Sequence, residues 1–141
     1  MTFYIAPFLW YNEINKFECN PDLHPGMKVR GFKMKKVLFA ASECVPFIKT
    51  GGLADVCGAL PKQFDKEEWD VRVVIPNYSC IPEKYRNQFE YVTHFYMGTG
   101  PYVPSKYVGV LKYELDGITY YFIDNQEYFD CFLPYGDIRY D

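Results

Sequence analysis

Residues 35–61, KKVLFAASECVPFIKTGGLADVCGALP, contain an apolar run, a glycine pair and an apolar periodicity, in that order. The run at 37–41 is apolar throughout, which is typical of a strand buried on both faces of a parallel sheet. After the glycines, the apolar positions that share one helical face are Leu53, Val56, Cys57, Leu60 and Phe64. Pro61 should kink or end this helix near residues 58–60, because proline lacks an amide hydrogen and its ring clashes with the preceding turn.

A second apolar run, at 71–75, follows a charged turn and ends at Pro76. Strand, helix and strand in this order predict a βαβ unit with parallel strands and a right-handed crossover. Residues 89–97 are predicted to form a further strand. The β-rich runs at 106–115 and 118–123 are separated by Asp-Gly, the pair typical of a type I′ hairpin turn. The predicted fold class is therefore α/β and Rossmann-like, with a parallel core and an added β-hairpin.

Composition sets wide limits on function. The 141 residues are enough for one ordinary domain, and a net charge of −3 gives no reason to expect a nucleic acid or a membrane surface as partner. Aromatic residues reach 20% of the chain, which indicates either dense sheet packing or flat surfaces that stack against ligands. Packing is the favoured interpretation.

The five cysteines are an odd number and include no CxxC pair. They are interpreted as reduced thiols of a cytoplasmic protein. The two histidines, His24 and His94, are far apart in the sequence and have no cysteine in zinc-binding spacing. The sequence therefore predicts no metal site.

Residues 1–33 differ in character from the rest of the chain. They begin with an apolar stretch but lack a basic leading region and a small-residue cleavage site, and the stretch is far shorter than the roughly 20 residues that span a bilayer. We expect residues 1–33 to form an irregular N-terminal extension. Translation from an upstream start codon, ahead of a natural start at Met34, would explain such an extension. Residues 34–141 form the predicted domain.

Lys49, Gly51 and Gly52 lie where the predicted strand leads into the predicted helix. Open α/β sheets bind ligands at such junctions, and the glycines would allow backbone amides at positive φ to approach a phosphate. The spacing matches neither a P-loop, whose lysine follows the last glycine, nor a GxGxxG fingerprint. An anion-binding loop and a plain tight turn beside a solvated lysine are equally compatible with these residues.

The same segment closely resembles bacterial glycogen and starch synthases, which carry Ser-Glu, Lys-x-Gly-Gly and Gly-Leu-Ala-Asp-Val at this spacing. The resemblance continues through VRVVIPNYSCIP at 71–82 and KYVGVLKYELDGITYYFIDN at 106–125. It covers Met34 to the C-terminus and none of residues 1–33. Asn77 departs from the pattern, because many members of the family have lysine after the proline.

The resemblance implies transfer of glucose from ADP-glucose to the non-reducing end of an α-1,4-glucan, with retention of anomeric configuration and without metal or cofactor. It implies that Lys49 contacts the phosphates of ADP-glucose, with Gly51 and Gly52 as backbone donors beside it. These groups would stabilise charge as the diphosphate leaves.

Four further residues are candidates for contacts with the acceptor or with sugars. Asp55 matches the aspartate of the family motif and is expected either near the acceptor glucan or paired with charges at the helix N-terminus. Glu43 is expected to bind sugar hydroxyls or, as the favoured alternative, to brace the loop. Tyr128 and Tyr135 offer faces for glucose rings, although packing or plain exposure is the favoured interpretation of both.

The resemblance also implies two Rossmann-like lobes with the active site between them, whereas this sequence ends at Asp141, partway through the first. No complete catalytic set is expected in this chain, and the C-terminal lobe is the missing partner. The chain is therefore interpreted as a synthase fragment that is inactive in isolation. The alternatives are a non-catalytic protein that binds a nucleotide sugar or a glucan, and an unrelated Rossmann-like oxidoreductase, which the absence of GxGxxG disfavours.

Overall fold

The computed structural model describes residues 34–98, 100 and 102–130. All of these residues belong to Met34–Asp141, one of the two units into which the chain divides. The predictions for residues 1–33, Cys131 and Tyr135 lie outside the described residues.

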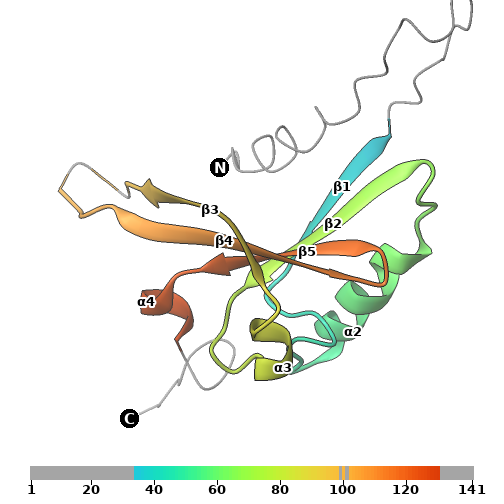
Figure 1. Cartoon of the computed structure of the whole chain (residues 1–141), viewed down its shortest axis with the longest axis horizontal. Coiled ribbons are helices and arrows are strands. Elements are labelled where there is room, and N and C mark those ends of the chain that lie inside the picture. The colour runs from blue at the N-terminus through green and yellow to red at the C-terminus, as the bar shows by residue number, and fades with distance from the viewer. Residues whose placement is uncertain (1–33, 99, 101, 131–141) are drawn as a thin grey trace, which may run out of the picture. The chain divides into compact units, whose positions relative to one another are not determined.

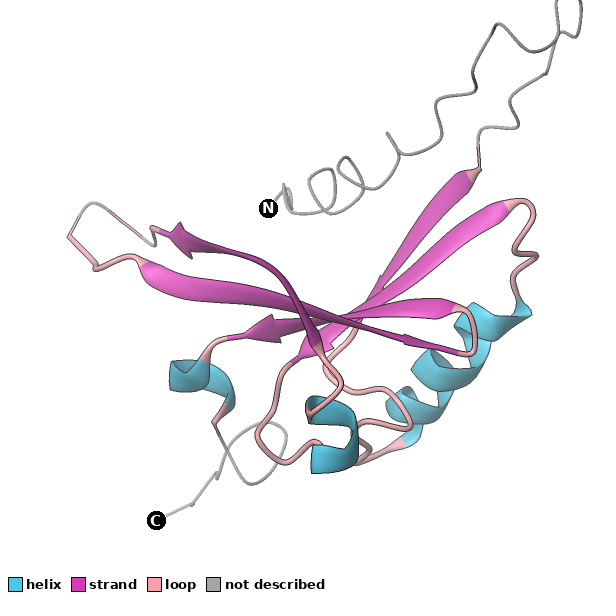
Figure 2. Cartoon of the chain, viewed as in Figure 1, coloured by secondary structure: helices cyan, strands magenta, loops and turns pink. Residues whose placement is uncertain are grey.

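The described residues form one five-stranded mixed sheet (Figures 1 and 2). Its strands are β1 (Lys35–Ala40), β2 (Trp69–Pro76), β3 (Glu90–Met97), β4 (Lys106–Leu115) and β5 (Ile118–Asp124). The helices are α2 (Gly52–Ala59), the 3-10 helix η2 (Leu60–Gln63), α3 (Glu83–Arg86) and α4 (Gln126–Phe129). The strand order is β1-β2-β5-β4-β3, in which β1, β2 and β5 run parallel and β4 is antiparallel to both of its neighbours. The predicted α/β class, with a parallel core and an added hairpin, is confirmed.

The turn between β4 and β5 has the backbone that its sequence predicts. Asp116 has φ 54° and Gly117 has φ 72°, and a type I′ turn requires positive φ at both central residues. Two lysine side chains also bond this turn. The ammonium group of Lys62 donates to the Asp116 carboxylate, and that of Lys66 donates to the backbone carbonyl oxygen of Asp116.

The core lies between the sheet and the helices α2 and α3, which cover one of its faces (Figure 2). Phe47, which is 2% exposed, stands at its centre with its ring 4.9 Å from that of Tyr120 and 5.1 Å from that of Phe122. Val73 and Ile75 of β2 complete this layer, and both are buried. For these rings the packing interpretation of the high aromatic content is confirmed.

The apolar face predicted for the helix is not the face that is buried. Its bulky members Leu53, Val56 and Leu60 are exposed by 46%, 55% and 43% of their surfaces. The residues of α2 that are buried are Ala54, Cys57 and Gly58. The prediction followed the large side chains, whereas the helix packs through its small ones.

Gly58 explains why the small side chains face inward. A Cβ at this position would lie 2.2 Å from Val45 Cγ2 and 2.8 Å from the Val45 carbonyl oxygen, so only glycine permits this approach. The amide of Val45 also donates to the carbonyl of Ala54 at 3.1 Å. The helix is therefore packed directly against the backbone of the preceding loop.

Two other expectations for this segment have mixed outcomes. The regular helix ends at Ala59 and continues as a 3-10 turn that contains Pro61, as the proline predicts. Strand β1 is only half-buried, because it ends the sheet that the described residues form, so the expectation of burial on both faces is wrong for this strand. Strand β2, with neighbours on both sides, is buried as expected. No helix in the described part of the chain is long and apolar enough to cross a membrane.

Candidate functional site

Residues 41–51, here called the glycine loop, connect the end of β1 to the start of α2. Because β1, β2 and β5 are parallel, their last residues, Ala40, Pro76 and Asp124, lie at one edge of the sheet, here called the carboxyl edge (Figure 1). Ligands of open α/β sheets bind outside this edge. The fold thus places the loop where the sequence predicted a binding site.

Two side chains anchor the glycine loop in the hydrophobic core. The side chains of Phe47 and Ile48 are buried, and the backbone amides of both residues donate to the carbonyl oxygen of Cys44, at 3.0 and 3.1 Å. An apolar anchor and backbone bonds of this kind hold the next residues, Lys49 to Gly51, in a defined place. The apolar half of the FIKTGG motif therefore positions its polar half.

Glu43 braces the loop from inside. Its side chain is buried, and one carboxylate oxygen accepts hydrogen bonds from the backbone amide and the hydroxyl of Thr50, both at 2.6 Å. These bonds from Thr50, together with backbone bonds from Gly51 and Ala54, lower the pKa of Glu43 although burial acts in the opposite direction. The carboxylate is thus held ionised at the N-terminus of α2, as the bracing interpretation of Glu43 predicts.

The glycine pair does not use positive φ. Gly51 is extended, with φ −151°, and Gly117 is the only described glycine with positive φ. A Cβ at Gly51 would meet only a Glu43 oxygen at 3.7 Å, and one at Gly52 would meet nothing within 4 Å. Neither strain nor close packing in the described structure therefore requires these two glycines.

Lys49 and Asp55 face each other across the start of α2. The ammonium nitrogen of Lys49 lies 2.7 Å from both carboxylate oxygens of Asp55, and about half of each side chain is exposed. The sequence treated the two residues as separate candidates, whereas they form one ion pair. Exposed pairs of this kind contribute about 0–1 kcal/mol to stability, so the pair can exchange partners at little cost.

Cys44 in the loop and Cys57 in α2 are unsuited to nucleophilic chemistry. Burial raises the pKa of Cys44 to about 12 and also raises that of Cys57, so both remain protonated at neutral pH. Among the described residues, no group of histidine, cysteine and acidic side chains has the arrangement of a metal site. The chemistry of this loop therefore rests on Lys49, Asp55 and backbone amides.

Other polar side chains at the carboxyl edge were not predicted to be site residues. The side-chain amide of Asn77, directly after β2, donates to the Asp124 carboxylate at 3.1 Å. A hollow of about 420 Å³ opens beside Asp124 and is lined by Tyr107, Asp124, Asn125, Gln126 and Glu127. For Asn77 and residues 124–127, the position directly after predicted strands was the signal that could have identified them, whereas Tyr107 lies at the start of a strand.

Of the two tyrosines proposed to stack on sugars, one lies in the described residues. Tyr128 of α4 is 57% exposed, and the ammonium nitrogen of Lys106 lies 5.9 Å from its ring centre.

A loop at the carboxyl edge of a Rossmann-like sheet is typical of α/β proteins that bind their ligands beyond the ends of the strands. Residues 36–141 match the family described as the starch synthase catalytic domain. The chain therefore belongs to that family. This assignment removes the oxidoreductase alternative.

Similar proteins are bacterial glycogen synthases. The chain is 56% identical to that of Lachnospira eligens over 108 residues and 55% identical to that of Lachnoclostridium phytofermentans, covering 77% of this chain in both cases. It spans 22% of the length of these two relatives. Among solved structures, the catalytic domain of starch synthase IV from Arabidopsis thaliana, bound to ADP and acarbose, superposes with a TM-score of 0.59. That match has 22% identity and covers 74% of this chain and 22% of the neighbour, and it supports the fold.

Proposed function

We propose that this chain is the first part of the N-terminal lobe of a glycogen synthase that transfers glucose from ADP-glucose to the non-reducing end of an α-1,4-glucan, with retention. Family membership and the bacterial glycogen synthases that it resembles support this reaction. The Arabidopsis starch synthase bound to ADP and acarbose supports a site for a nucleotide and a glucan in the same fold.

The observation that carries the proposal is the empty space at Gly52 beside the charge of Lys49. Gly52 is the first residue of α2, and apart from its chain neighbours and the backbone of its own helix no described atom lies within 4 Å of the position where its Cβ would be. Since no neighbour in the described structure requires a glycine here, close approach of a ligand to the backbone accounts for it. The exposed ammonium group of Lys49 makes that ligand an anion.

In this proposal Lys49 leaves its ion pair with Asp55 and binds the diphosphate of ADP-glucose. Both side chains are half-exposed, so the ion pair opens without uncovering buried charge. Lys49 then stabilises the negative charge that develops as ADP leaves. Asp55 is released by the same step and becomes available to accept a hydrogen bond from a hydroxyl group of the acceptor glucan.

Glu43 has a supporting role. It bonds Thr50, which lies between Lys49 and the glycine pair, and so fixes the direction in which Lys49 leaves the backbone. Because Glu43 is buried against the loop, we assign it no contact with sugars.

The 141-residue chain by itself is proposed to bind ADP weakly and to transfer no glucose. It covers about a fifth of the length of its relatives, and the rest of the site comes from the second lobe. Purified protein incubated with ADP-glucose and glycogen should release no ADP. Glucan extension by this chain would refute the proposed inactivity but not the proposed site.

NMR titration of the isotopically labelled chain with ADP tests the site. The backbone amides of residues 49–55 should shift progressively, and Lys49→Ala should weaken the affinity about tenfold, because a hydrogen bond to a charged group is lost. Lys62→Ala is the matched control, since Lys62 forms a similar exposed ion pair with Asp116 on the β4–β5 turn. Shifts elsewhere, or equal effects of the two variants, would contradict the assignment.

Gly52→Ala separates a binding role from a structural one. The substitution adds one methyl group into open space, so the free energy of unfolding should be unchanged or slightly higher. The affinity for ADP should nevertheless fall, because the methyl group occupies the space of the ligand. An unchanged affinity would remove the observation on which the proposal rests.

A further inference from the structure

Strand β1 ends the sheet that the described residues form, and one side of its backbone faces no described strand. The amide of Ala41, directly after β1, donates to the carbonyl oxygen of Val74 on β2. Successive residues of a strand present their amides and carbonyls to opposite sides, so those of Leu38 and Ala40 point away from β2. This side of β1 is here called the open edge.

Helix α2 carries three large apolar side chains on its outer surface. Leu53, Val56 and Leu60 recur at the spacing of one helix face and are exposed by 46%, 55% and 43% of their surfaces. The helix packs inward through its small residues, so its own burial does not account for the three large ones. Contiguous exposed apolar groups are typical of a surface that a partner covers. These three residues are called the α2 stripe.

The α2 stripe lies on the same side as the open edge. A strand, a helix and a parallel strand connect with a right-handed crossover, which puts β2 to the right of β1 when the helix is in front and the strands point upward. The stripe is about 120° around the helix from the inward-facing residues, on the side turned away from β2. The edge and the stripe therefore form one continuous surface.

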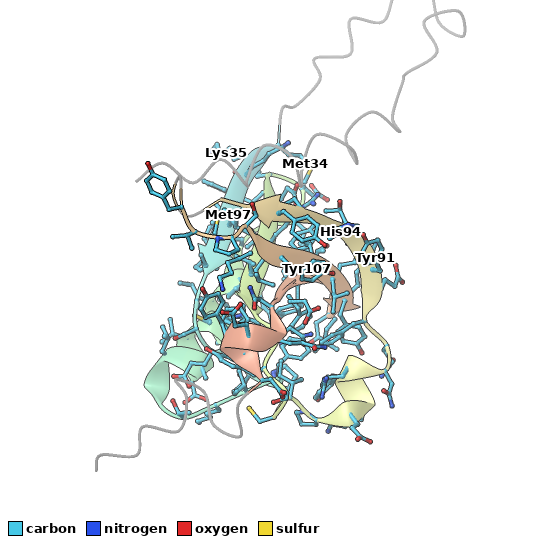
Figure 3. The ribbon with its side chains drawn as sticks, turned by 90° about the vertical axis from the view of Figure 1, so that its left-hand side faces the viewer. Met34, Lys35, Tyr91, His94, Met97 and Tyr107 are labelled. Atoms are coloured by element: carbon cyan, nitrogen blue, oxygen red, sulfur yellow. The ribbon has the colours of Figure 1, made fainter. Side chains whose placement is uncertain are left out.

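Lys35 lies at the start of β1 (Figure 3). Charged side chains on an edge strand commonly repel a further strand. The ammonium nitrogen of Lys35 lies 4.7 Å from the ring centre of Trp69, its partner on β2, so this charge is turned toward the sheet. The centre of the strand, residues 37–39, is apolar and half-buried. A further strand would therefore meet apolar side chains at the centre of the open edge.

A second copy of β1 is complementary to this edge in an antiparallel register. Leu38 pairs with Leu38 of the second copy through their outward amides and carbonyls, and Val37 then lies opposite Phe39. The lysines at the start of each strand face alanines at the end of the other: Lys35 faces Ala41, and Lys36 faces Ala40. The register thus pairs apolar side chains with one another and sets no two lysines opposite each other.

The twofold axis of this register also brings the two α2 helices together. The axis is perpendicular to the sheet, so α2 of both copies lies on one face, with the two helices antiparallel on either side of the seam. Each α2 stripe then meets the stripe of the other copy. Antiparallel helices also have favourable dipoles.

We propose that the open edge and the α2 stripe form a self-association surface, through which two copies of this chain join their sheets into one. The carboxyl edges of the two copies lie at opposite sides of the joined sheet, because the two β1 strands are antiparallel, so each glycine loop stays open to its ligand. A six-residue strand and three side chains are fewer than the roughly 20–30 residues per partner of a standard interface. We therefore expect a dissociation constant of about 10–100 μM.

Sedimentation equilibrium of the 141-residue chain over a range of concentrations tests the proposal. The wild type should be a monomer when dilute and a dimer when concentrated. Val56→Glu should weaken the dimer at least about tenfold, because the twofold axis buries two unpaired carboxylates. Val103→Glu is the matched control, since Val103 is 49% exposed, against 55% for Val56, and lies between β3 and β4. Urea unfolding of dilute protein should be similar for both variants.

Amide hydrogen exchange of the wild type tests the seam without a substitution. The amides of Leu38 and Ala40 should exchange more slowly in concentrated than in dilute protein, whereas that of Ala41, already bonded to Val74, should not change. A chain that stays monomeric at millimolar concentration would overturn the proposal, because another segment or protein would then have to cover this surface. Equal effects of Val56→Glu and Val103→Glu, or a dimer that leaves Leu38 and Ala40 unprotected, would also overturn it.

Discussion

The glycine loop and the β3–β4 hairpin both lie at the carboxyl edge, yet they are built in opposite ways. The loop is held by a buried carboxylate, two buried apolar side chains and a helix packed against its backbone. The hairpin is at the outer side of the sheet and presents its aromatic side chains to solvent. The first region fixes a backbone, whereas the second fixes only a set of side chains.

This difference predicts how each region responds to substitution. Substitution of a buried group of the loop must move the backbone, because these groups contact backbone atoms. A change in the hairpin can be absorbed by rotation of an exposed side chain. Substitutions of the buried groups should therefore affect stability and binding together, whereas substitutions of exposed side chains in either region should change stability little.

The largest effect is expected from Gly58→Ala. The added methyl group would lie 2.2 Å from Val45 Cγ2 and 2.8 Å from the Val45 carbonyl oxygen, so the helix must move away from the loop. We expect the free energy of unfolding, measured with urea, to fall by about 2–3 kcal/mol. Gly52→Ala is the control in the same helix, because its methyl group meets no atom within 4 Å.

The matching substitution in the hairpin is Gly109→Ala. Its methyl group would meet the end of the Tyr107 side chain at 2.8 Å, which can rotate into solvent, and Asp124 Cβ at 3.0 Å. The loss of unfolding free energy should be smaller, about 1 kcal/mol. A loss as large as that of Gly58→Ala would contradict the proposed contrast between the two regions.

The parts of this structure that were predictable from the sequence depend on local rules. The Asp116-Gly117 turn followed from residue types that tolerate positive φ, and the end of the regular helix followed from Pro61. The strands at 71–75 and 106–115 followed from apolar and β-branched runs. In each case a few neighbouring residues determine the result.

The parts that were not predictable depend on tertiary contacts between elements. Leu53, Val56 and Leu60 have the period of a buried stripe, yet α2 turns its small residues inward because Gly58 allows the loop backbone to approach. The ion pair of Lys49 with Asp55 needed the loop geometry as well as the motif. The pairing of β3 with β4 includes an irregularity between Tyr91 and Thr93 that no alternation in the sequence indicates.

Replacement of the buried carboxylate by Glu43→Gln should have an effect that depends on pH. Hydrogen bonds from Thr50 lower the folded-state pKa of Glu43 below its ordinary value of 4.5. Its contribution to stability is therefore present above about pH 4.5 and is lost as the pH falls through the lower folded-state value. The stability difference between wild type and Glu43→Gln should be largest at neutral pH and should shrink in acid.

Urea unfolding at several pH values measures this difference, and NMR titration with ADP at neutral pH should show weaker binding by the same variant. Glu114→Gln, at an exposed position of β4, is the control for the change in net charge. A stability difference that stays constant between neutral and acid pH would show that Glu43 braces the loop by shape and not by charge.

The smallest effect on stability is expected from Asp55→Asn. The Lys49–Asp55 pair is half-exposed, so its loss should change the free energy of unfolding by no more than about 0.5 kcal/mol. The affinity for ADP should rise by about threefold, because Lys49 no longer has to leave a carboxylate before it binds the diphosphate. Asp116→Asn, which removes the partner of Lys62, should leave ADP affinity unchanged. Weaker ADP binding by Asp55→Asn would mean that Asp55 holds Lys49 in its binding position and does not compete with the ligand for it.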